Sequence, residues 1–291
     1  MAGRKKKSTC YEGRYVENFN FYLKHTELDK LISHELDQVL QEQLKSVGAN
    51  KSSLDVLGVG SGGGEKDVQI LSLLQSLFPS TPITTDIVDG SSELINNFKA
   101  LVAKTDTLQT IPFTWHVMRS EDFELQVKAS PDVKKFDFIH MIHVIYYMED
   151  VDETLRFYHS LLKNNGRIMI VLNAAGHGWD SLWTTYKKEL QTSDFPVYNS
   201  SAHVKTSLEN HGFTYEEHII PSSIDITECF NPNSTTGESL LSFMTETRHF
   251  QQSFTPEIRA GILDHLRNKC STEQDGKLIL DKTYTCFFVH A

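Results

Sequence analysis

The sequence is poor in cysteine and has fewer basic than acidic residues. Its four cysteines, Cys10, Cys229, Cys270 and Cys286, are widely scattered with no CxxC pair. They therefore indicate neither a disulfide framework nor a zinc site, and no metal is expected. Lysine and arginine number 28 against 38 aspartate and glutamate residues. This balance argues against a nucleic-acid partner, because phosphate neutralisation needs a surplus of positive charge.

The sequence also lacks a long apolar run. Its most apolar stretch, from Phe136 to Met148, contains one aspartate and two histidines and is too short to span a bilayer. No apolar segment follows the basic run Arg4 to Lys7, so we expect a solvated tail there rather than a signal peptide. An address signal or a contact with a polyanion is the alternative interpretation of this run. With 291 residues, 39% of them apolar, the chain is typical of a soluble globular protein. We therefore expect a cytoplasmic protein that does not bind a membrane.

Strand-like and helix-like patterns alternate through much of the chain. Two helical patterns come first, Tyr15 to Leu23 and Leu28 to Leu44, and Gly48 is a plausible stop for the second. The alternation that follows predicts parallel strands joined by right-handed crossovers. The expected fold is therefore α/β, a doubly wound sheet with helices on both faces. Strands are expected at 54–59, 83–88, 112–117, 136–144 and 167–172, and helices at 68–77, 91–103 and 151–162, the last stopped by Asn164-Asn165-Gly166.

From Gly176 onward the pattern is less regular. Composition predicts a loop over 231–237, which reads Asn-Pro-Asn-Ser-Thr-Thr-Gly. No repeat or low-complexity segment is present. Helices are expected at 200–211, 237–247 and 257–267, and strands at 214–220 and 284–289.

A glycine-rich loop over residues 58–64 joins the first predicted strand to a helix. Glycine lets the backbone adopt positive φ and approach a ligand closely, and the helix N-terminus offers unpaired N–H groups. Counted from Gly58, the glycines satisfy the GxGxxG pattern of dinucleotide sites. Gly60, Gly62 and Gly64 instead satisfy GxGxG, which resembles motif I of class I methyltransferases. On spacing alone, a nicotinamide-dependent oxidoreductase and a methyltransferase both stay open.

An acid at the end of the second strand is expected to accept hydrogen bonds from ribose hydroxyls. Asp89 stands there, further from the loop than the ~20 residues typical of a dinucleotide site. The run Asp89-Gly90-Ser91-Ser92 also has the composition of a helix cap, which is the alternative interpretation. Asp86, earlier in the same strand, is a second candidate.

Several segments together resemble the histamine N-methyltransferase family, and the resemblance runs almost end to end. It implies a class I methyltransferase, with a seven-stranded Rossmann-like sheet, a helical substrate-binding cap and S-adenosyl-L-methionine as methyl donor. We therefore expect one methyltransferase unit (1–291) with a helical cap segment (1–50), a cofactor-binding core (51–175), and substrate-binding insertions with final antiparallel strands (176–291). The resemblance is carried by Tyr15-Val16-Glu17, Phe19, His25-Thr26-Glu27, Asp67 to Leu71, Leu101 to Thr105, Phe136 to Ile142, Tyr146-Tyr147, Gly178-Trp179-Asp180, Leu182-Trp183, Asp225-Ile226 and Thr245-Glu246-Thr247.

The resemblance also implies where S-adenosylmethionine binds. This sequence departs from the family at Leu94, where the family has glutamine, and the usual acid two residues before motif I is replaced by Gly58. The implied cofactor positions are Gly60, Gly62 and Gly64 on the loop, Asp89 for the ribose, Leu94, Ser120 near the adenine, and Ile142 on the fourth strand.

The implied acceptor is a small imidazole, and Glu27 and His143 are the expected catalytic residues because either can bind the second ring nitrogen or the substrate amine. From their spacing alone, Phe19 and Tyr22 are expected in a helix core, since aromatic residues at helical spacing are usually buried. The implied acceptor-binding positions are Tyr15, Phe19, Tyr22, Glu27, His143, Tyr147, Trp179, Trp183, Phe243 and Lys282.

Two of these positions differ from the family, which has glutamine at His143 and asparagine at Lys282. A lysine suits a substrate carboxylate, which histamine lacks and which carnosine and histidine carry. The alternative is that Lys282 points to solvent from an exposed hairpin. We therefore expect an imidazole N-methyltransferase, monomeric like the family, with carnosine favoured over histamine. A non-catalytic protein that binds S-adenosylmethionine or imidazoles is the alternative of another class.

Overall fold

The structure is a computed structural model that describes residues 12–25, 34–191 and 198–291. The chain divides into two compact units, each built from three stretches of sequence. We call the first the sheet unit, which comprises residues 29–175, 199–221 and 283–291. The second, the helical unit, comprises residues 1–28, 176–198 and 222–282. Glu27, one of the two expected catalytic residues, lies outside the described residues.

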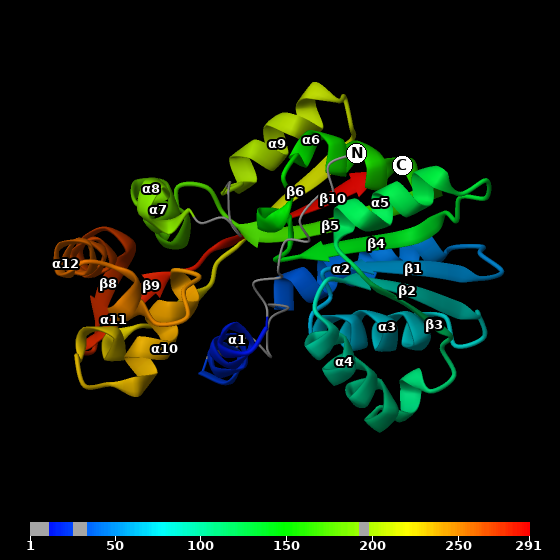
Figure 1. Cartoon of the computed structure of the whole chain (residues 1–291). Helices are drawn as coiled ribbons and strands as arrows, with labels where there is room; N and C mark the ends of the chain where they lie inside the picture. Colours follow the sequence, from blue (N-terminus) through cyan, green and yellow to red (C-terminus); the bar gives the residue numbers. More distant parts are fainter. Residues whose placement is uncertain (1–11, 26–33, 192–197) are drawn as a thin grey trace, which may run out of the picture. The chain divides into compact units, whose positions relative to one another are not determined.

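Seven strands form the sheet of the sheet unit, in the order β3-β2-β1-β4-β5-β10-β6 (Figure 1). Neighbours from β3 to β5 are parallel, whereas β10 runs antiparallel to β5 and β6. The strand order reverses where β1 meets β4, which makes this border the switch point of a doubly wound sheet. The expected seven-stranded α/β fold is confirmed. The strands are β1 (Leu54–Val59), β2 (Ile83–Asp89), β3 (Phe113–Val117), β4 (Phe136–Ile142), β5 (Leu162–Asn173), β6 (Tyr215–Ile220) and β10 (Tyr284–His290).

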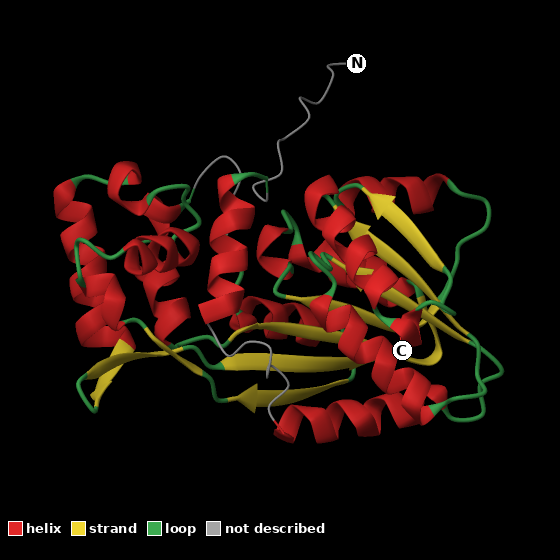
Figure 2. Cartoon of the chain, turned by 90° about the horizontal axis from the view of Figure 1, so that it is seen from below, coloured by secondary structure: helices red, strands yellow, loops and turns green. Residues whose placement is uncertain are grey.

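Helices flank this sheet on both sides (Figures 1 and 2). In Figure 1, α3 and α4 lie on one side of the strands and α5, α6 and α9 on the other. Ser91 caps α4, because its Oγ accepts a hydrogen bond from the Leu94 amide at 3.2 Å. The helices are α2 (His34–Gly48), α3 (Glu65–Leu77), α4 (Ser92–Lys104), α5 (Ser120–Ala129), α6 (Val151–Ser160) and α9 (Ser201–Asn210), with short 3-10 turns η2 (Asp106–Leu108) and η3 (Ile145–Tyr147).

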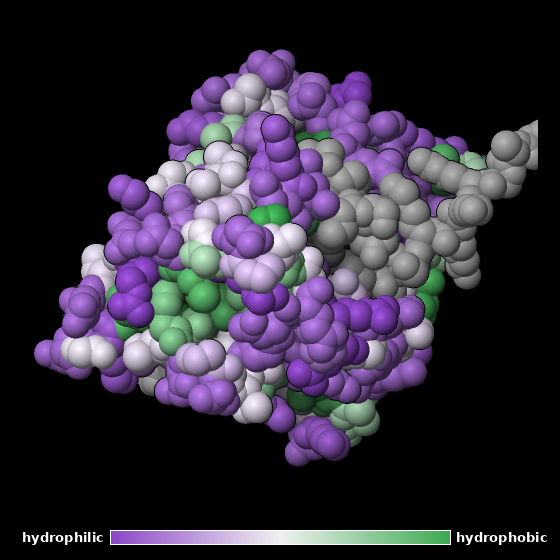
Figure 3. All heavy atoms as spheres, turned by 60° about the vertical axis from the view of Figure 1, so that its left-hand side comes forward, coloured by the Kyte–Doolittle hydropathy of each residue, from purple (hydrophilic) through white to green (hydrophobic). Residues whose placement is uncertain are grey.

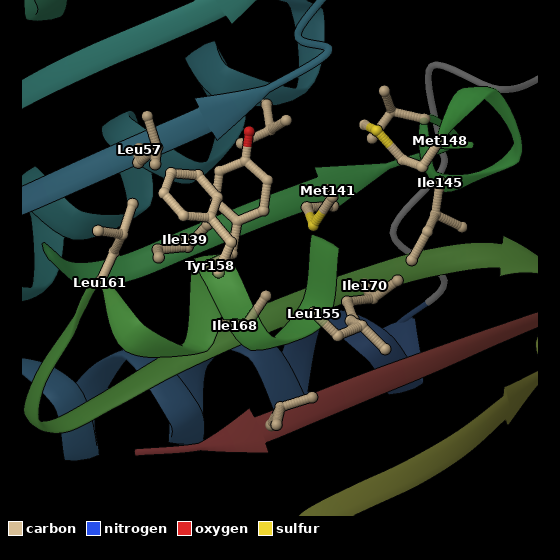
Figure 4. Packing of buried hydrophobic residues seen from close by; sticks show 14 of the residues in the cluster. Leu57, Ile139, Met141, Ile145, Met148, Leu155, Tyr158, Leu161, Ile168 and Ile170 are labelled. Atoms are coloured by element: carbon tan, nitrogen blue, oxygen red, sulfur yellow. The ribbon is translucent and has the colours of Figure 1, made fainter. Parts of the chain in front are cut away.

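Apolar side chains cover both faces of the sheet, which explains why its strands read as continuous apolar runs. Consecutive residues of β1 show this: Leu57 packs in a cluster with α5, α6 and α9, whereas Val56 packs in a cluster with α2 and α3. Figure 4 shows the first cluster, in which Tyr158 of α6 lies with Ile139 of β4 and Ile168 of β5. The parallel strands are therefore held rigidly, and their carboxyl ends are fixed relative to one another.

Most predicted elements of this unit are present with ends shifted by a few residues, but one expectation is wrong. Asn164-Asn165-Gly166 does not stop a helix before a strand; it lies inside β5, which begins at Leu162. Asn165 adopts a left-handed φ of 66°, and the β4–β5 register shifts between Phe136 and Phe138. This irregularity lets turn-forming residues occupy a strand. No pattern indicated α5, in which Phe123 is the buried residue.

The helical unit contains short helices and a three-stranded antiparallel sheet of order β7-β9-β8. The predicted loop over 231–237 is shorter than expected, because Ser234 caps α10 by accepting a hydrogen bond from the Gly237 amide at 3.1 Å. The small sheet was not predicted. The elements are α1 (Arg14–His25), α7 (Gly178–Thr185), α8 (Lys187–Leu190), β7 (Ser223–Asp225), η4 (Thr227–Phe230), α10 (Thr235–Met244), α11 (Phe250–Ser253), α12 (Pro256–His265), the π-helical turn η5 (Leu266–Cys270), β8 (Ser271–Gln274) and β9 (Lys277–Asp281).

The surface seen when the left-hand side of Figure 1 is turned forward is mostly hydrophilic, with smaller apolar areas (Figure 3). Within the described ranges, no helix is long and apolar enough to cross a membrane.

Candidate active site

The glycine loop after β1 adopts left-handed backbone conformations at alternate residues. Gly60, Gly62 and Gly64 have φ angles of 65°, 55° and 85°. L-residues with a side chain rarely adopt these values, so each position favours glycine for backbone reasons. The positive φ angles coincide with the GxGxG spacing, whereas Gly58 and Gly63 do not share them.

The three glycines differ in what surrounds them. A Cβ on Gly60 would lie 2.1 Å from Val144 Cγ2, and a Cβ on Gly64 would lie 2.0 Å from Phe98 Cδ2. Packing inside the protein therefore excludes a side chain at both positions. Among the described residues, a Cβ on Gly62 would meet only Leu94 Cδ1, at 4.0 Å. The backbone of Gly62 is thus open to a ligand on the side that a side chain would fill.

Asp89, the last residue of β2, lies beside this loop. Its Oδ2 accepts a hydrogen bond from the Gly62 amide at 2.9 Å, and its Oδ1 accepts one from the Ser91 amide at 2.8 Å. Burial raises the pKa of Asp89 above its ordinary value and the charge of Asp67 adds to this, although both amide hydrogen bonds act in the opposite direction. Each carboxylate oxygen keeps a lone pair that can accept a ribose hydroxyl.

The parallel register brings the other expected cofactor residues to the same edge of the sheet. Val59 of β1 pairs with Met141 of β4, one residue before Ile142. Ser120 opens α5 after β3, and its Oγ lies 2.7 Å from the Tyr158 hydroxyl. Leu94 is buried and forms an apolar wall behind Gly62. Four segments therefore converge at the carboxyl ends of β1 to β4, the usual ligand-binding edge of such sheets.

His143 follows β4 in a left-handed conformation with φ 53°. Its amide donates to the Val171 carbonyl at 2.8 Å, so the turn away from the sheet begins at this residue. The ring lies 4.7 Å from the Tyr284 ring, centroid to centroid, and its Nδ1 is 3.4 Å from the Tyr146 hydroxyl. Backbone strain of this kind in a residue with a side chain clusters at functional sites. Tyr147, also expected in the acceptor site, is half-buried, with its ring edge-to-face to Tyr146.

Four of the expected acceptor-binding aromatic residues come together in the helical unit. The rings of Tyr22 in α1 and Phe243 in α10 stack with centroids 4.1 Å apart. Trp179 of α7 packs edge-on against both, at 5.9 Å from each. Phe19 lies 5.9 Å from Phe243. We call Phe19, Tyr22, Trp179 and Phe243 the aromatic cluster.

Lys282 packs against the aromatic cluster. Its Nζ lies 4.6 Å from the centroid of the Tyr22 ring, and the residue is only 3% exposed. The alternative that Lys282 points to solvent from an exposed hairpin is therefore wrong. The residue follows β9, and its amide donates to the Ser222 carbonyl at 2.8 Å, which holds the chain where β9 ends.

The two other expected aromatic residues take different partners. Trp183 stacks on Tyr198 with centroids 5.3 Å apart, and its Nε1 donates to the Met244 carbonyl at 3.0 Å. The ring of Tyr15 faces the Arg248 guanidinium at 5.6 Å. These contacts account for the burial of Trp183 and for the position of Tyr15, and they do not by themselves indicate contact with a ligand.

Sequence patterns did not indicate a group of buried polar residues beneath the glycine loop. Asp67 and His140 are each 2% exposed, and Asp67 Oδ1 lies 3.1 Å from His140 Nε2. Ser61 Oγ donates to the same carboxylate oxygen at 2.8 Å. His140 inside an apolar strand could have indicated this group, because a buried imidazole needs a hydrogen-bond partner.

These features fit S-adenosylmethionine. The open backbone face of Gly62 can receive a ligand without a clash, and the Asp89 carboxylate beside it can bind the ribose diol. The N-terminus of α3 follows directly, where unpaired N–H groups lie.

Comparison with known proteins agrees with this arrangement. A family described as a methyltransferase domain matches residues 28–218. The chain is 37% identical to histamine N-methyltransferase A of Xenopus laevis, covering 96% of this chain and 95% of the relative. It is 34% identical to carnosine N-methyltransferase 2 of Gallus gallus, covering 91% of this chain and 83% of the relative. The solved structure of YcgJ from Bacillus subtilis, at 14% identity, covers 87% of this chain and 98% of its own with a TM-score of 0.55, which shows a shared fold. The chain belongs to the histamine N-methyltransferase family and is an S-adenosylmethionine-dependent methyltransferase.

Proposed function

We propose that this enzyme methylates a ring nitrogen of a small imidazole that carries a carboxylate, with carnosine as the first candidate and histidine as the second. The relatives support the imidazole, because histamine and carnosine, after which they are named, share that ring. The observation that supports a carboxylate on the substrate is the buried ammonium of Lys282 beside the aromatic cluster.

Charge explains this preference. An aromatic cluster is a suitable receptor for a substrate ammonium, but here Lys282 Nζ already lies over the Tyr22 ring. A second ammonium a few ångströms away costs about 1–4 kcal/mol, depending on the effective dielectric constant. A carboxylate at the same distance is attracted by a similar amount and forms a charge-assisted hydrogen bond.

The main requirement of the methyl-transfer reaction on the protein is to position the two reactants. S-adenosylmethionine supplies an electrophilic methyl group and leaves as S-adenosylhomocysteine. Protonated imidazole has a pKa of about 6.5, so at neutral pH the ring is mostly neutral and keeps a nucleophilic nitrogen lone pair. Holding that nitrogen in line with the methyl carbon supplies most of the rate. We assign Gly60, Gly62, Gly64, Asp89, Leu94, Ser120 and Ile142 to the cofactor, and Tyr15, Tyr147, Trp183 and the aromatic cluster to the acceptor.

The second ring nitrogen must lose its proton, because methylation converts the ring into a cation. His143 and Glu27 are the groups we assign to this step. The strained position of His143, with a half-buried ring, supports its role. We expect Glu27→Gln to lower turnover at least tenfold while the Kd for S-adenosylmethionine stays unchanged. Unchanged turnover in this variant removes Glu27 from the mechanism.

Methyl transfer from labelled S-adenosylmethionine to a set of acceptors tests the proposal. The most informative pair is carnosine and β-alanylhistamine, because they differ only in the carboxylate. We expect kcat/KM to be at least tenfold higher for carnosine. Equal values for the two acceptors contradict the assignment of Lys282.

The variant Lys282→Asn tests the same point from the protein side, since it restores the neutral side chain of the family. We expect it to lower kcat/KM for carnosine and histidine at least tenfold and to raise it for histamine. Lys277→Asn is the matched control, because this lysine of the same small sheet is exposed and paired with Asp225. A similar loss in the control shows that the effect is structural.

Histamine, which has no carboxylate, is the alternative acceptor. Relatives named for histamine are as similar to this chain as the relative named for carnosine, at 37% and 34% identity. Faster methylation of histamine than of carnosine by the wild-type enzyme makes histamine the substrate and leaves Lys282 with a packing role.

We further propose that the enzyme acts as a cytoplasmic monomer on small molecules, without nucleic acid or membrane. The acidic formal net charge of -10 supports the absence of nucleic acid. Cys229, Cys270 and Cys286 are free thiols, which suits a reducing compartment. Burial raises the pKa of Cys229 to about 12 and that of Cys270 to about 11, so these thiols are not nucleophiles. Light scattering and fractionation test these points.

A further inference from the structure

We propose that Asp67, bridging Ser61 and His140, is the positioning residue that sets the glycine loop for S-adenosylmethionine. The inference rests on the proposed placement of the cofactor at this loop.

Gly58 explains why Asp67 can take this position. A Cβ on Gly58 would lie 2.4 Å from both Asp67 Oδ1 and Ser61 Oγ, and 3.0 Å from His140 Cε1. The space that a side chain at Gly58 would need is therefore filled by the carboxylate of Asp67 and its two partners. The carboxylate reaches this space from α3 instead of from β1.

The bridge joins the segments that form the cofactor edge. Ser61 lies between the left-handed residues Gly60 and Gly62, and its hydroxyl donates to Asp67 Oδ1 at 2.8 Å. His140 lies on β4, two residues before Ile142, and contacts the same oxygen at 3.1 Å. A single carboxylate oxygen therefore connects the loop and β4 to the first turn of α3.

The loop is held from a second direction by Asp89, which accepts the Gly62 amide at 2.9 Å. Neighbouring loop residues thus have separate anchors, a side-chain hydrogen bond at Ser61 and a backbone hydrogen bond at Gly62. Because Asp67 is 2% exposed, we assign it to holding the loop rather than to touching the ligand. A loop preset in its bound conformation loses less entropy when the ligand binds.

Calorimetric titration with S-adenosylmethionine and S-adenosylhomocysteine, without acceptor, tests the inference. We expect Ser61→Ala to weaken both ligands about tenfold and by the same factor, because one hydrogen bond to a charged group is lost. Ser61→Thr keeps the hydroxyl and should restore the affinity. Ser72→Ala, on the exposed side of α3, is the matched control. Asp67→Asn should weaken both ligands at least as much as Ser61→Ala, but breaking a buried pair also threatens folding.

Two results overturn the inference. The first is wild-type affinity in Ser61→Ala, within about twofold; a lower unfolding temperature beside it means a purely structural role. The second is a larger loss for S-adenosylmethionine than for S-adenosylhomocysteine, which means that the carboxylate acts on the sulfonium charge directly.

Asp89→Asn separates this inference from the placement of the cofactor. If Asp89→Asn weakens both ligands and Ser61→Ala does not, the cofactor binds at the loop and only the role of Asp67 fails. If neither variant changes the affinity, the cofactor binds elsewhere and both proposals fail. Hydrogen exchange of the Gly62 and Gly64 amides in the ligand-free protein gives an independent measure, since Ser61→Ala should speed it.

Discussion

The residues assigned to the cofactor, in the sheet unit, present backbone groups and a carboxylate, whereas those assigned to the acceptor in the helical unit present aromatic rings and an ammonium. The first set follows from short segments at the ends of adjacent parallel strands. The second set comes from α1, α7, α10 and the residue after β9. With this assignment, the methyl donor is bound by backbone groups that any such sheet provides. We expect the choice of acceptor to depend on side chains, which can change one at a time.

The largest effects on stability and on cofactor affinity are expected from Gly64→Ala and Gly62→Ala, two substitutions in the glycine loop of the sheet unit. At Gly64 a Cβ lies 2.0 Å from Phe98, whose ring is fully buried and cannot move away. We expect Gly64→Ala to lower the free energy of unfolding by about 3 kcal/mol, from overpacking and left-handed strain. Gly62→Ala should cost only the strain, about 1–2 kcal/mol, yet weaken S-adenosylmethionine more than tenfold.

Urea unfolding and calorimetric titration measure these two effects separately. Equal losses of stability in both variants would show that the open side of Gly62 does not exist. Wild-type affinity for S-adenosylmethionine in Gly62→Ala would remove this glycine from the cofactor site.

Phe243→Ala tests whether the aromatic cluster of the helical unit binds the acceptor and not the cofactor. It removes the ring that stacks on Tyr22 at 4.1 Å and contacts Trp179. We expect KM for the acceptor to rise about tenfold, because an aromatic pair and its apolar area are lost. The Kd for S-adenosylmethionine should stay unchanged. Phe254→Ala is the control, since Phe254 is a half-buried phenylalanine of the same unit that contacts Phe250 instead; a change in cofactor affinity in Phe243→Ala contradicts the division of roles.

Acid stability should differ between carboxylates of the two units. Burial pushes the pKa of Asp86 up, but hydrogen bonds from His116 and Lys134 and their charges outweigh it and hold the pKa below the ordinary 3.8. A lowered pKa contributes stability above the unfolded value and loses it as pH falls through the folded one. We expect Asp86→Asn to cost about 1–2 kcal/mol at pH 7, with the difference from wild type shrinking below about pH 4.

Asp225 of the helical unit provides the comparison for this measurement. Burial raises the pKa of Asp225, but hydrogen bonds from Thr227 and Lys277 and the lysine charge outweigh it and lower the pKa. The Asp225 side chain is 40% exposed. Solvent screening should make the effect of Asp225→Asn smaller than that of Asp86→Asn. Circular dichroism of urea unfolding from pH 7 to pH 2 checks both, and an equal effect of the two variants would contradict the importance of burial.

Sequence patterns predicted the sheet unit closely because its signals are local. The bounds of β1 match the apolar run 54–59, and the helix expected after it is α3, whose first turn begins directly beyond the glycines. A strand buried on both faces has to be apolar throughout, so it is visible in the sequence. The same reasoning failed at Asn164-Asn165-Gly166, because these residues lie between Leu162 and Arg167, which pair with β4 on either side of the register shift.

The helical unit was harder to predict because its strands are short and β8 carries no apolar residue. β8 reads Ser-Thr-Glu-Gln and shows none of the alternation that marks a half-buried strand. Its pairing with β9 depends on residues brought close by folding. Of the acceptor residues, family resemblance indicated the aromatic positions, but no pattern showed whether Lys282 is buried.

By itself the sequence determined that this chain forms a doubly wound sheet with a glycine loop, because apolar periodicity and glycine spacing act over a few residues. Its likeness to known proteins determined the family and the methyl donor. Only the tertiary structure decided that Lys282 lies over the Tyr22 ring and that Asp67 fills the space above Gly58. Both depend on side chains that meet from separate elements, and the free energy of burying an ammonium or a carboxylate is set by those neighbours rather than by the residues beside it in the chain.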